Sequence, residues 1–197
     1  RHFDATFIRN QKRRDTKGFR ENVFFDEAMT FIRECQNEPF FCYLATYSPH
    51  TPLAAPEKFI KPFREAGLND THATYLAMIE NIDYNLGRLM KFLKDTNREK
   101  DTIIVMVNDN GVTEGLDIYN ANMRGSKCTA WEGGSRAFSF WRWKGTWTFL
   151  IVPLRESIKL LRWRVVFTTP KRSSTYWQRD AIRNTFPKTF WRHPYRT

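Results

Sequence analysis

Two short, continuously apolar runs on either side of a long amphipathic stretch most constrain how this chain can fold. The runs are residues 40–45 (FFCYLA) and 102–108 (TIIVMVN). Each run is typical of a strand that is buried on both faces. Between them, from about residue 71 to residue 94, apolar residues recur at helical spacing and charged residues occupy mainly the other side. This pattern predicts a long amphipathic helix.

The order strand, helix, strand predicts two parallel strands joined by a right-handed crossover, and therefore an α/β fold. A further helix is predicted over residues 22–35, where apolar residues again recur at helical spacing. Parallel strands end at the same edge of their sheet, and open parallel sheets bind ligands outside those ends. We therefore expect His50, Asp109 and Asn110, which follow the two strands, to lie on one rim.

Asp109 and Asn110 directly follow the second predicted strand and precede Gly111. Their carboxylate and amide oxygens are hard ligands, which suit Ca²⁺ or Mg²⁺ better than zinc or copper. Two ligands do not complete such a site, so the others have to come from elsewhere. The alternative is an ordinary capped turn, because Asp, Asn and Gly are the usual turn formers.

His50 stands between Pro49 and Pro52, which stiffen the backbone on both sides. A rigidly held imidazole at the mouth of a sheet is a candidate general acid or base. The expected sheet brings this imidazole to the same rim as Asp109. The alternative is an ordinary surface histidine.

A basic, glycine-containing loop is predicted over residues 123–136 (MRGSKCTAWEGGSR). It places Arg124, Lys127 and Arg136 among three glycines, just before another apolar run, AFSFW. Backbone N–H groups and cations in such a loop can close around an oxyanion such as phosphate or sulfate. The alternative is a solvated basic loop that binds no ligand.

The positive charge of the chain is concentrated at its C-terminal end. Residues 146–197 hold eleven Lys and Arg against two acids, which is +9 of the total net charge of +11, and they contain no glycine. A globular segment of this length normally uses glycine in turns and helix caps. We interpret the tail as a reading-frame slip or a mispredicted gene end. A genuine basic and aromatic tail that contacts nucleic acid or an acidic polysaccharide is the alternative.

Cysteine usage and hydropathy add little to these predictions. Cys35, Cys42 and Cys128 have no paired spacing, which indicates neither a zinc site nor a disulfide framework. No apolar run is long enough to span a bilayer, and no signal-peptide pattern is visible.

Taken in order, the stretches FFCYLATYSPHTPLAAPEKF, VNDNG and MRGSKCTAWEGGSRAFSFWRWKG resemble consecutive blocks of the arylsulfatase family. The intervening stretch THATYLAMIENIDYNLGRLMKFLKD resembles the helix that these enzymes carry between the first and second of these stretches, that is, between the Pro-His loop and the Asp-Asn-Gly turn. The resemblance covers roughly residues 1–145. It implies an alkaline-phosphatase-like sandwich with a mainly parallel central sheet flanked by helices, present here as a partial catalytic domain. Residues 146–197 match no recognised domain.

The resemblance also implies specific roles for the candidate residues. Asp109 and Asn110 are expected to bind a divalent cation, usually Ca²⁺ and alternatively Mg²⁺. His50 is expected beside the ester oxygen, and Lys127 is expected to hold the sulfate, so both bind substrate and take part in catalysis. The implied activity is hydrolysis of sulfate esters of sugars or aryl compounds, in a periplasmic, extracellular or lysosomal protein.

Two departures from the family pattern qualify that activity. Sulfatases use a formylglycine nucleophile made within a Cys/Ser-x-Pro-x-Arg motif, and no such motif occurs here. Their paired Asp metal ligands are also absent, and both features lie N-terminal to the segment present. We therefore expect an internal fragment that is inactive alone. The alternatives are a related phosphodiesterase or phosphonate hydrolase, and a non-enzymatic basic binding protein built around the tail.

Overall fold

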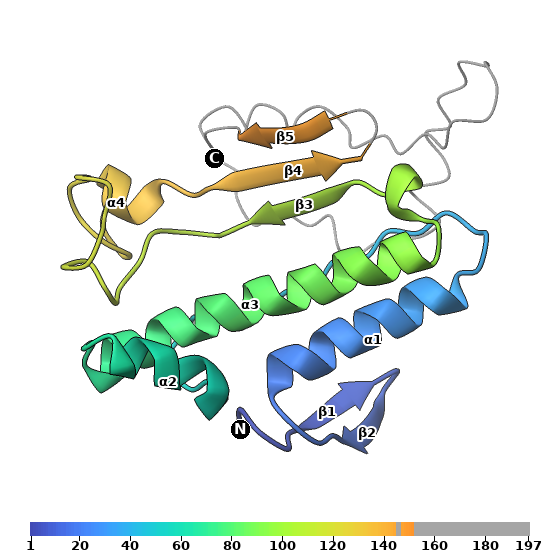
Figure 1. The fold of residues 1–197 in the computed structure, drawn as a ribbon, viewed down its shortest axis with the longest axis horizontal. Coiled ribbons are helices and arrows are strands. Elements are labelled where there is room, and N and C mark those ends of the chain that lie inside the picture. Colours follow the sequence, from blue (N-terminus) through green and yellow to red (C-terminus); the bar gives the residue numbers. More distant parts are fainter. Residues whose placement is uncertain (145–146, 152–197) are drawn as a thin grey trace, which may run out of the picture. The chain divides into compact units, whose positions relative to one another are not determined.

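A computed structural model describes residues 1–144 and 147–151, and only these residues are discussed below (Figure 1). The chain begins with the strands β1 (Thr6–Arg9) and β2 (Lys12–Asp15) and continues through the helices α1 (Arg20–Glu34), α2 (Glu57–Glu65) and α3 (Asp70–Asp95). It then forms the short 3₁₀ helix η1 (Glu99–Asp101), the strand β3 (Ile104–Val107), the helix α4 (Glu132–Ser135) and the strands β4 (Ser139–Trp143) and β5 (Trp147–Ile151).

The two long helices that the sequence predicts are confirmed as α1 and α3. Helix α3 begins after Asn69, whose side-chain oxygen accepts a hydrogen bond from His72 N at 2.9 Å, and this bond satisfies one of the unpaired N–H groups of the first turn. The buried face of α3 does not coincide fully with the stripe of apolar residues seen in the sequence. Asn81 and Asn85 are fully buried, whereas Ile79 is 41% exposed.

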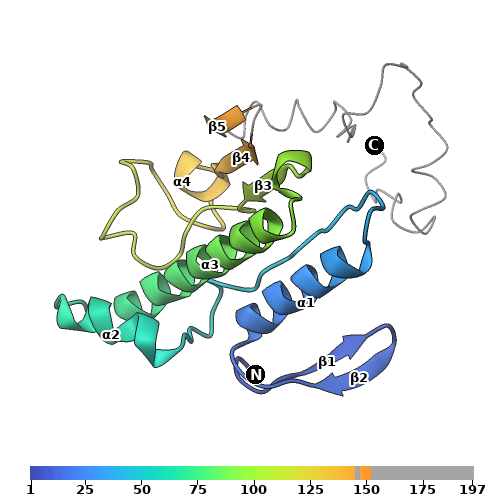
Figure 2. The same ribbon diagram turned by 45° about the vertical axis from the view of Figure 1, so that its right-hand side comes forward.

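Helices α1 and α3 pack against each other, as both ribbon views show (Figures 1 and 2). Asn22 Oδ1 on α1 accepts hydrogen bonds from Asn81 Nδ2 at 3.1 Å and from Asn85 Nδ2 at 2.8 Å on α3. A buried amide group is costly unless it is hydrogen-bonded. These three side chains therefore favour one register of the helix pair, which fixes where the N-terminal end of α1 lies along α3.

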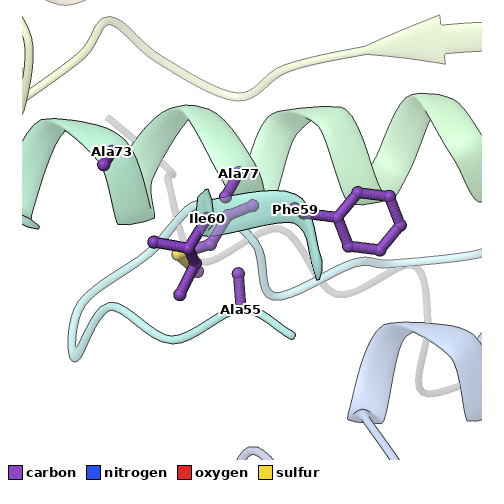
Figure 3. Close-up of a cluster of buried hydrophobic side chains, with 6 residues drawn as sticks. Ala55, Phe59, Ile60, Ala73 and Ala77 are labelled. Atoms are coloured by element: carbon purple, nitrogen blue, oxygen red, sulfur yellow. The ribbon is translucent and has the colours of Figure 1, made fainter. Parts of the chain in front are cut away.

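A small hydrophobic cluster joins α2 to the first half of α3. It consists of buried apolar side chains from the approach to α2, from α2 and from α3: Ala55, Phe59, Ile60, Ala73, Ala77 and Met78 (Figure 3). The alanines on α3 present little bulk, so the larger side chains of α2 can approach its backbone closely. This packing fixes the segment that follows the His50 loop.

The described sheet that contains β3 is antiparallel throughout. Its strand order is β3-β4-β5, with Val105 opposite Trp141 and Val107 opposite Ser139. Residues 40–46, which were expected to form a parallel neighbour of β3, carry no strand in the described part of the chain. The expected parallel pair is therefore not confirmed. Apolar composition can indicate a buried strand, but a strand also needs a hydrogen-bonded neighbour, and for β3 that neighbour is β4.

Candidate functional site

The loop that carries His50 is anchored to the first turn of α1 through a buried carboxylate. Glu21 is fully buried, and its Oε1 accepts hydrogen bonds from Ser48 N at 2.8 Å and from Ser48 Oγ at 2.7 Å. Hydrogen bonds to a charged acceptor are stronger than those between neutral groups. Glu21 therefore holds the backbone two residues before His50 in place.

Aromatic and cationic contacts also fix the imidazole of His50. The Arg20 guanidinium carbon lies 3.7 Å from the centre of the Tyr47 ring, and that ring lies 5.4 Å from the ring of His50. His50 Nδ1 lies 2.7 Å from the carbonyl oxygen of Thr51. Because a carbonyl oxygen can only accept, Nδ1 carries the hydrogen of this bond. The other nitrogen, Nε2, is then the one that can exchange a proton.

Asp109 and Asn110 lie in the turn directly after β3, and the side chain of Asn108 organises this turn. Asn108 Nδ2 donates to the carbonyl oxygen of Asn110 at 2.6 Å, and Asn108 Oδ1 accepts from Phe138 N at 2.5 Å. The second bond ties the turn to the residue that precedes β4. Asp109 is exposed and Asn110 is half-buried, so a carboxylate and an amide are presented together at the end of a strand.

Backbone hydrogen bonds join this turn to the basic loop. Gly111 N donates to Gly134 O at 2.8 Å, and Lys127 N donates to Val112 O at 3.0 Å. A Cβ atom on Gly111 would lie 1.7 Å from Gly133 O, and one on Gly133 would lie 2.1 Å from the oxygen of Gly125. Such approaches to backbone atoms are sterically impossible. The turn can therefore meet the basic loop only without a side chain at Gly111, and the basic loop can fold onto itself only without one at Gly133.

The three cations of the basic loop are not equivalent. The guanidinium carbon of Arg124 lies 3.6 Å from the ring centre of Trp131, and Arg136 forms a 3.8 Å ion pair with Glu132. Lys127 is half-buried and forms no ion pair with any residue that the structure describes. Of the three, Lys127 is therefore the cation with its charge available to an oxyanion.

A separate contact ties the segment between these two loops to α3. His72 Nε2 lies 3.3 Å from Asp117 Oδ1. Tyr75 packs close to Gly115, and burial, followed by the negative charge of Glu114, raises the pKa of the Tyr75 hydroxyl. These contacts hold Gly115 and Asp117, which lie between the turn and the basic loop, against α3.

The structure brings together the Asp109–Asn110 turn and the Lys127 loop through backbone hydrogen bonds. His50 makes no hydrogen bond or ion pair to either of them within the described residues, so its expected place on the same rim stays a prediction. The oxygen ligands fit a hard cation in kind but not in number, because no group of three or more His, Cys, Asp and Glu side chains gathers anywhere in residues 1–144. No helix of that part of the chain is long and apolar enough to cross a membrane.

Sequence reasoning missed Glu21 and Ser48, the pair that anchors the His50 loop. An acidic residue in the first turn of a predicted helix normally indicates a favourable interaction with the helix dipole. Nothing in the sequence distinguishes that ordinary role from burial against a loop 27 residues away. The two consecutive residues Ser48 and Pro49 carry a turn signal only.

Comparison with known proteins places this arrangement in a family. The family model described as Sulfatase matches residues 3–157, more than half of the chain. The uncharacterized sulfatase YdeN of Escherichia coli (strain K12) is 30% identical over 145 residues, which are 71% of this chain and 26% of that protein. Arylsulfatase J of Mus musculus is 34% identical over 103 residues, which are 52% of this chain and 17% of that protein.

Solved structures agree with the sequence comparison. Ps i-CgsB in complex with k-i-k-neocarrahexaose shares 30% sequence identity with this chain at a TM-score of 0.64, over 69% of this chain and 30% of that one. The chain belongs to the sulfatase family, whose fold is alkaline-phosphatase-like, and the described residues form an α/β part of it. It spans less than a third of the length of each of these three proteins.

Replacing Gly111 by alanine tests the close contact between the two loops. Because the new Cβ atom would lie 1.7 Å from Gly133 O, we expect Gly111→Ala to lower the free energy of unfolding by about 2 kcal/mol or more and to speed amide exchange at Lys127. Gly87→Ala is the matched control, since a Cβ atom there, on α3, meets nothing within 4 Å. It should stabilise by up to about 1 kcal/mol, as alanine does in a helix. Equal effects in urea denaturation would contradict the proposed contact.

Replacing Glu21 by alanine tests the anchor of the His50 loop. The variant leaves the buried Ser48 N–H and hydroxyl groups without their acceptor, so we expect a loss of about 1–3 kcal/mol and faster amide exchange at Ser48 and His50. The control Glu34→Ala removes an exposed carboxylate of the same helix, 3.8 Å from Arg9, and should cost less than about 1 kcal/mol. Unchanged exchange at Ser48 in Glu21→Ala would show that the loop is held by other contacts.

Proposed function

We propose that this chain supplies one part of the active site of a sulfuric ester hydrolase. The observation that carries the proposal is the direct joining of the Asp109–Asn110 turn to the Lys127 loop, with Lys127 N bonded to Val112 O at 3.0 Å. This contact puts cation-binding oxygens and an unpaired ammonium group on adjacent loops, in a chain that belongs to the sulfatase family. A sulfate group, with three terminal oxygens to be neutralised, matches that combination.

The residues of this chain have distinct roles in the proposed reaction. The Lys127 ammonium group binds a sulfate oxygen and stabilises its negative charge as the sulfur is attacked. His50, in its cationic form, donates the proton on Nε2 to the ester oxygen when the sulfur–oxygen bond breaks. Over the whole reaction one water is consumed, and the products are the free hydroxyl compound and inorganic sulfate. Glu21 and Ser48 act on this step only by keeping the His50 loop in place.

Asp109 and Asn110 would hold a divalent cation, Ca²⁺ in preference to Mg²⁺. When bound, the cation stabilises negative charge on the sulfate oxygens. Calcium takes about six to eight oxygen ligands at roughly 2.3–2.6 Å, so this pair needs further ligands from outside the described residues. The formylglycine nucleophile has the same requirement, because the 197 residues contain no Cys/Ser-x-Pro-x-Arg motif.

The finer features of the fold and the substrate belong to the same proposal. In the complete domain, β3 would join a mainly parallel central sheet, and that sheet would bring His50 to the rim that carries Asp109. The basic residues 146–197, apart from 147–151, lie outside the described residues, and the boundary near residue 145 stays a prediction. A periplasmic, extracellular or lysosomal location is the setting that the family implies.

Among sulfate esters of sugars and of aryl compounds, we choose a sulfated carbohydrate as the proposed substrate class. One solved relative is a complex with an oligosaccharide, k-i-k-neocarrahexaose. The relatives are named as sulfatases, which favours sulfate esters over the phosphodiesters or phosphonates of a related hydrolase. The family match over residues 3–157 likewise favours a sulfatase over a purely non-enzymatic role built around the tail.

The proposed function is tested with this chain combined with the N-terminal part of a sulfatase domain, which carries the remaining ligands and the nucleophile. We expect this combined protein to hydrolyse an aryl sulfate and to bind Ca²⁺ orders of magnitude more tightly than the chain alone, which should bind in the millimolar range or worse. Asp109→Ala should abolish both gains, because it removes a charged ligand. Activity and calorimetry provide the two measurements.

The control for that experiment is an acid outside the turn. Asp117 is close in sequence but contacts His72, so Asp83→Ala, which removes an exposed carboxylate of α3, is the cleaner comparison. It should leave turnover and Ca²⁺ affinity largely intact. Turnover that survives Asp109→Ala, or equal losses in the two variants, would refute the assignment of the metal ligands.

A further inference from the structure

The hairpin of β1 and β2 displays a concentration of positive charge that the candidate site does not use. Its tip, residues 9–14 (RNQKRR), has four cations in six residues. Arg9, Asn10, Lys12, Arg13 and Arg14 line one open hollow of about 360 Å³. We infer that this hairpin binds a sulfated glycan chain through its sulfate groups, away from the residues assigned to hydrolysis.

Contacts with α1 hold the hairpin in a fixed position. The rings of Phe7 and Phe24 lie 5.0 Å apart. On the face of the hairpin that carries Phe7, the Glu27 carboxylate forms ion pairs with Arg9 Nε at 3.0 Å and with Arg14 Nη1 at 2.8 Å. This agrees with the strand register, which pairs Phe7 with Arg14. Cationic side chains that are already ordered before binding lose less conformational entropy when a ligand binds.

The turn of the hairpin is also tightly defined. Asn10 and Gln11 both have left-handed backbone conformations, with φ of 49° and 66°, as a two-residue hairpin turn with the twist of the strands requires. The register then places Lys12 opposite Arg9 and Arg13 opposite Ile8. Successive residues of a strand point to opposite faces, so Lys12 and Arg13 extend the positive charge over both faces of the tip.

The ion pairs within the protein leave much of this charge unmatched. Glu27 is shared by Arg9 and Arg14, and Glu34 lies 3.8 Å from Arg9. Lys12 and Arg13 form no ion pair with any residue in 1–144. An Arg side chain presents a planar fork of N–H donors that matches the oxygens of sulfate. The hairpin tip is therefore suited to a ligand that carries several anionic groups in a row.

The choice of a sulfated glycan among polyanions rests on the proposed function, since a sulfated carbohydrate is the proposed substrate class. A second observation separates it from single-stranded nucleic acid, which is usually bound by cations together with aromatic rings that stack on bases. Residues 9–14 contain no aromatic side chain, and the nearby Phe7 ring packs on Phe24. The exposed apolar residue of the hairpin is Ile8, which is 75% exposed and has no ring on which a base could stack.

The inference is tested on the full chain with two charge-matched double variants. Lys12→Gln with Arg13→Gln removes two cations of the hairpin. Lys94→Gln with Lys100→Gln removes two exposed cations from α3 and η1, neither of which has an ion-pair partner in residues 1–144. The probes are a heparin-derived hexasaccharide, its desulfated form, and a single-stranded oligonucleotide of equal net charge. Calorimetry at several salt concentrations gives the affinity and its salt dependence.

We expect the hairpin variant to bind the sulfated hexasaccharide at least about tenfold more weakly than the unaltered chain. The slope of log affinity against log salt concentration should become less steep by about one to two. The control variant should lose less than about twofold, and the desulfated hexasaccharide should bind weakly to all three proteins. The charge of residues 146–197 is the same in every protein, so it cancels in the comparison.

Equal losses in the two variants would overturn the inference, because the chain would then respond only to its net charge. An oligonucleotide that loses as much affinity as the glycan in the hairpin variant would also overturn it, because the hairpin would then not distinguish sulfate from phosphate chains. Failure of sulfatase turnover in the combined protein, with the glycan result intact, would remove the proposed reaction but leave the glycan-binding surface.

Discussion

The candidate site depends on one contact, in which two loops meet backbone to backbone because glycines stand on both sides. Gly111 N bonds to Gly134 O at 2.8 Å, and a side chain at Gly111 would overlap the carbonyl oxygen of Gly133 in the opposite loop. This approach joins the end of β3 to the loop that precedes β4. It therefore places the acidic turn next to Lys127, although Lys127 lies 18 positions after Asp109 in the sequence. The bond from Lys127 N to Val112 O at 3.0 Å joins the same two loops.

The His50 loop is held by different contacts, but a continuous path of contacts connects it to the two loops that meet at Gly111. Asp117 in the glycine-bearing segment contacts His72 on α3, and α3 is joined to α1 through the hydrogen bonds of Asn22. The first turn of α1 then holds the His50 loop through Glu21 and Ser48. Each link is a polar contact between elements, so changing one of these side chains would alter how the loops are held.

Much of this could be predicted from the sequence, for identifiable physical reasons. Helical periodicity persists over many residues, which is why α1 and α3 were expected at nearly their observed positions. The Asp-Asn-Gly turn after β3 followed from turn chemistry at the end of an apolar run. The nearness of the turn to the basic loop was expected only from the family resemblance, which implies a shared site for the two.

The remaining features could not be predicted because they depend on partners that are distant in sequence. The run at residues 40–46 reads as a buried strand, yet Phe41 and Tyr43 are 54% and 79% exposed and no strand forms there in the described part of the chain. Whether an apolar run becomes a strand depends on its neighbour, which local pattern does not reveal. The burial of Glu21 and the helix register set by Asn22 have the same origin.

The central claim is that the His50 loop, the Asp109–Asn110 turn and the Lys127 loop face one sulfate group. It is tested most directly by adding sodium sulfate to the chain combined with the N-terminal part of a sulfatase domain, against sodium chloride at equal ionic strength, while two-dimensional NMR follows the amide signals of His50, Gly111 and Lys127. The account predicts that the three signals shift along one binding curve and that Lys127→Ala abolishes all three shifts. Shifts confined to one loop, or a His50 shift that persists in Lys127→Ala, would contradict it.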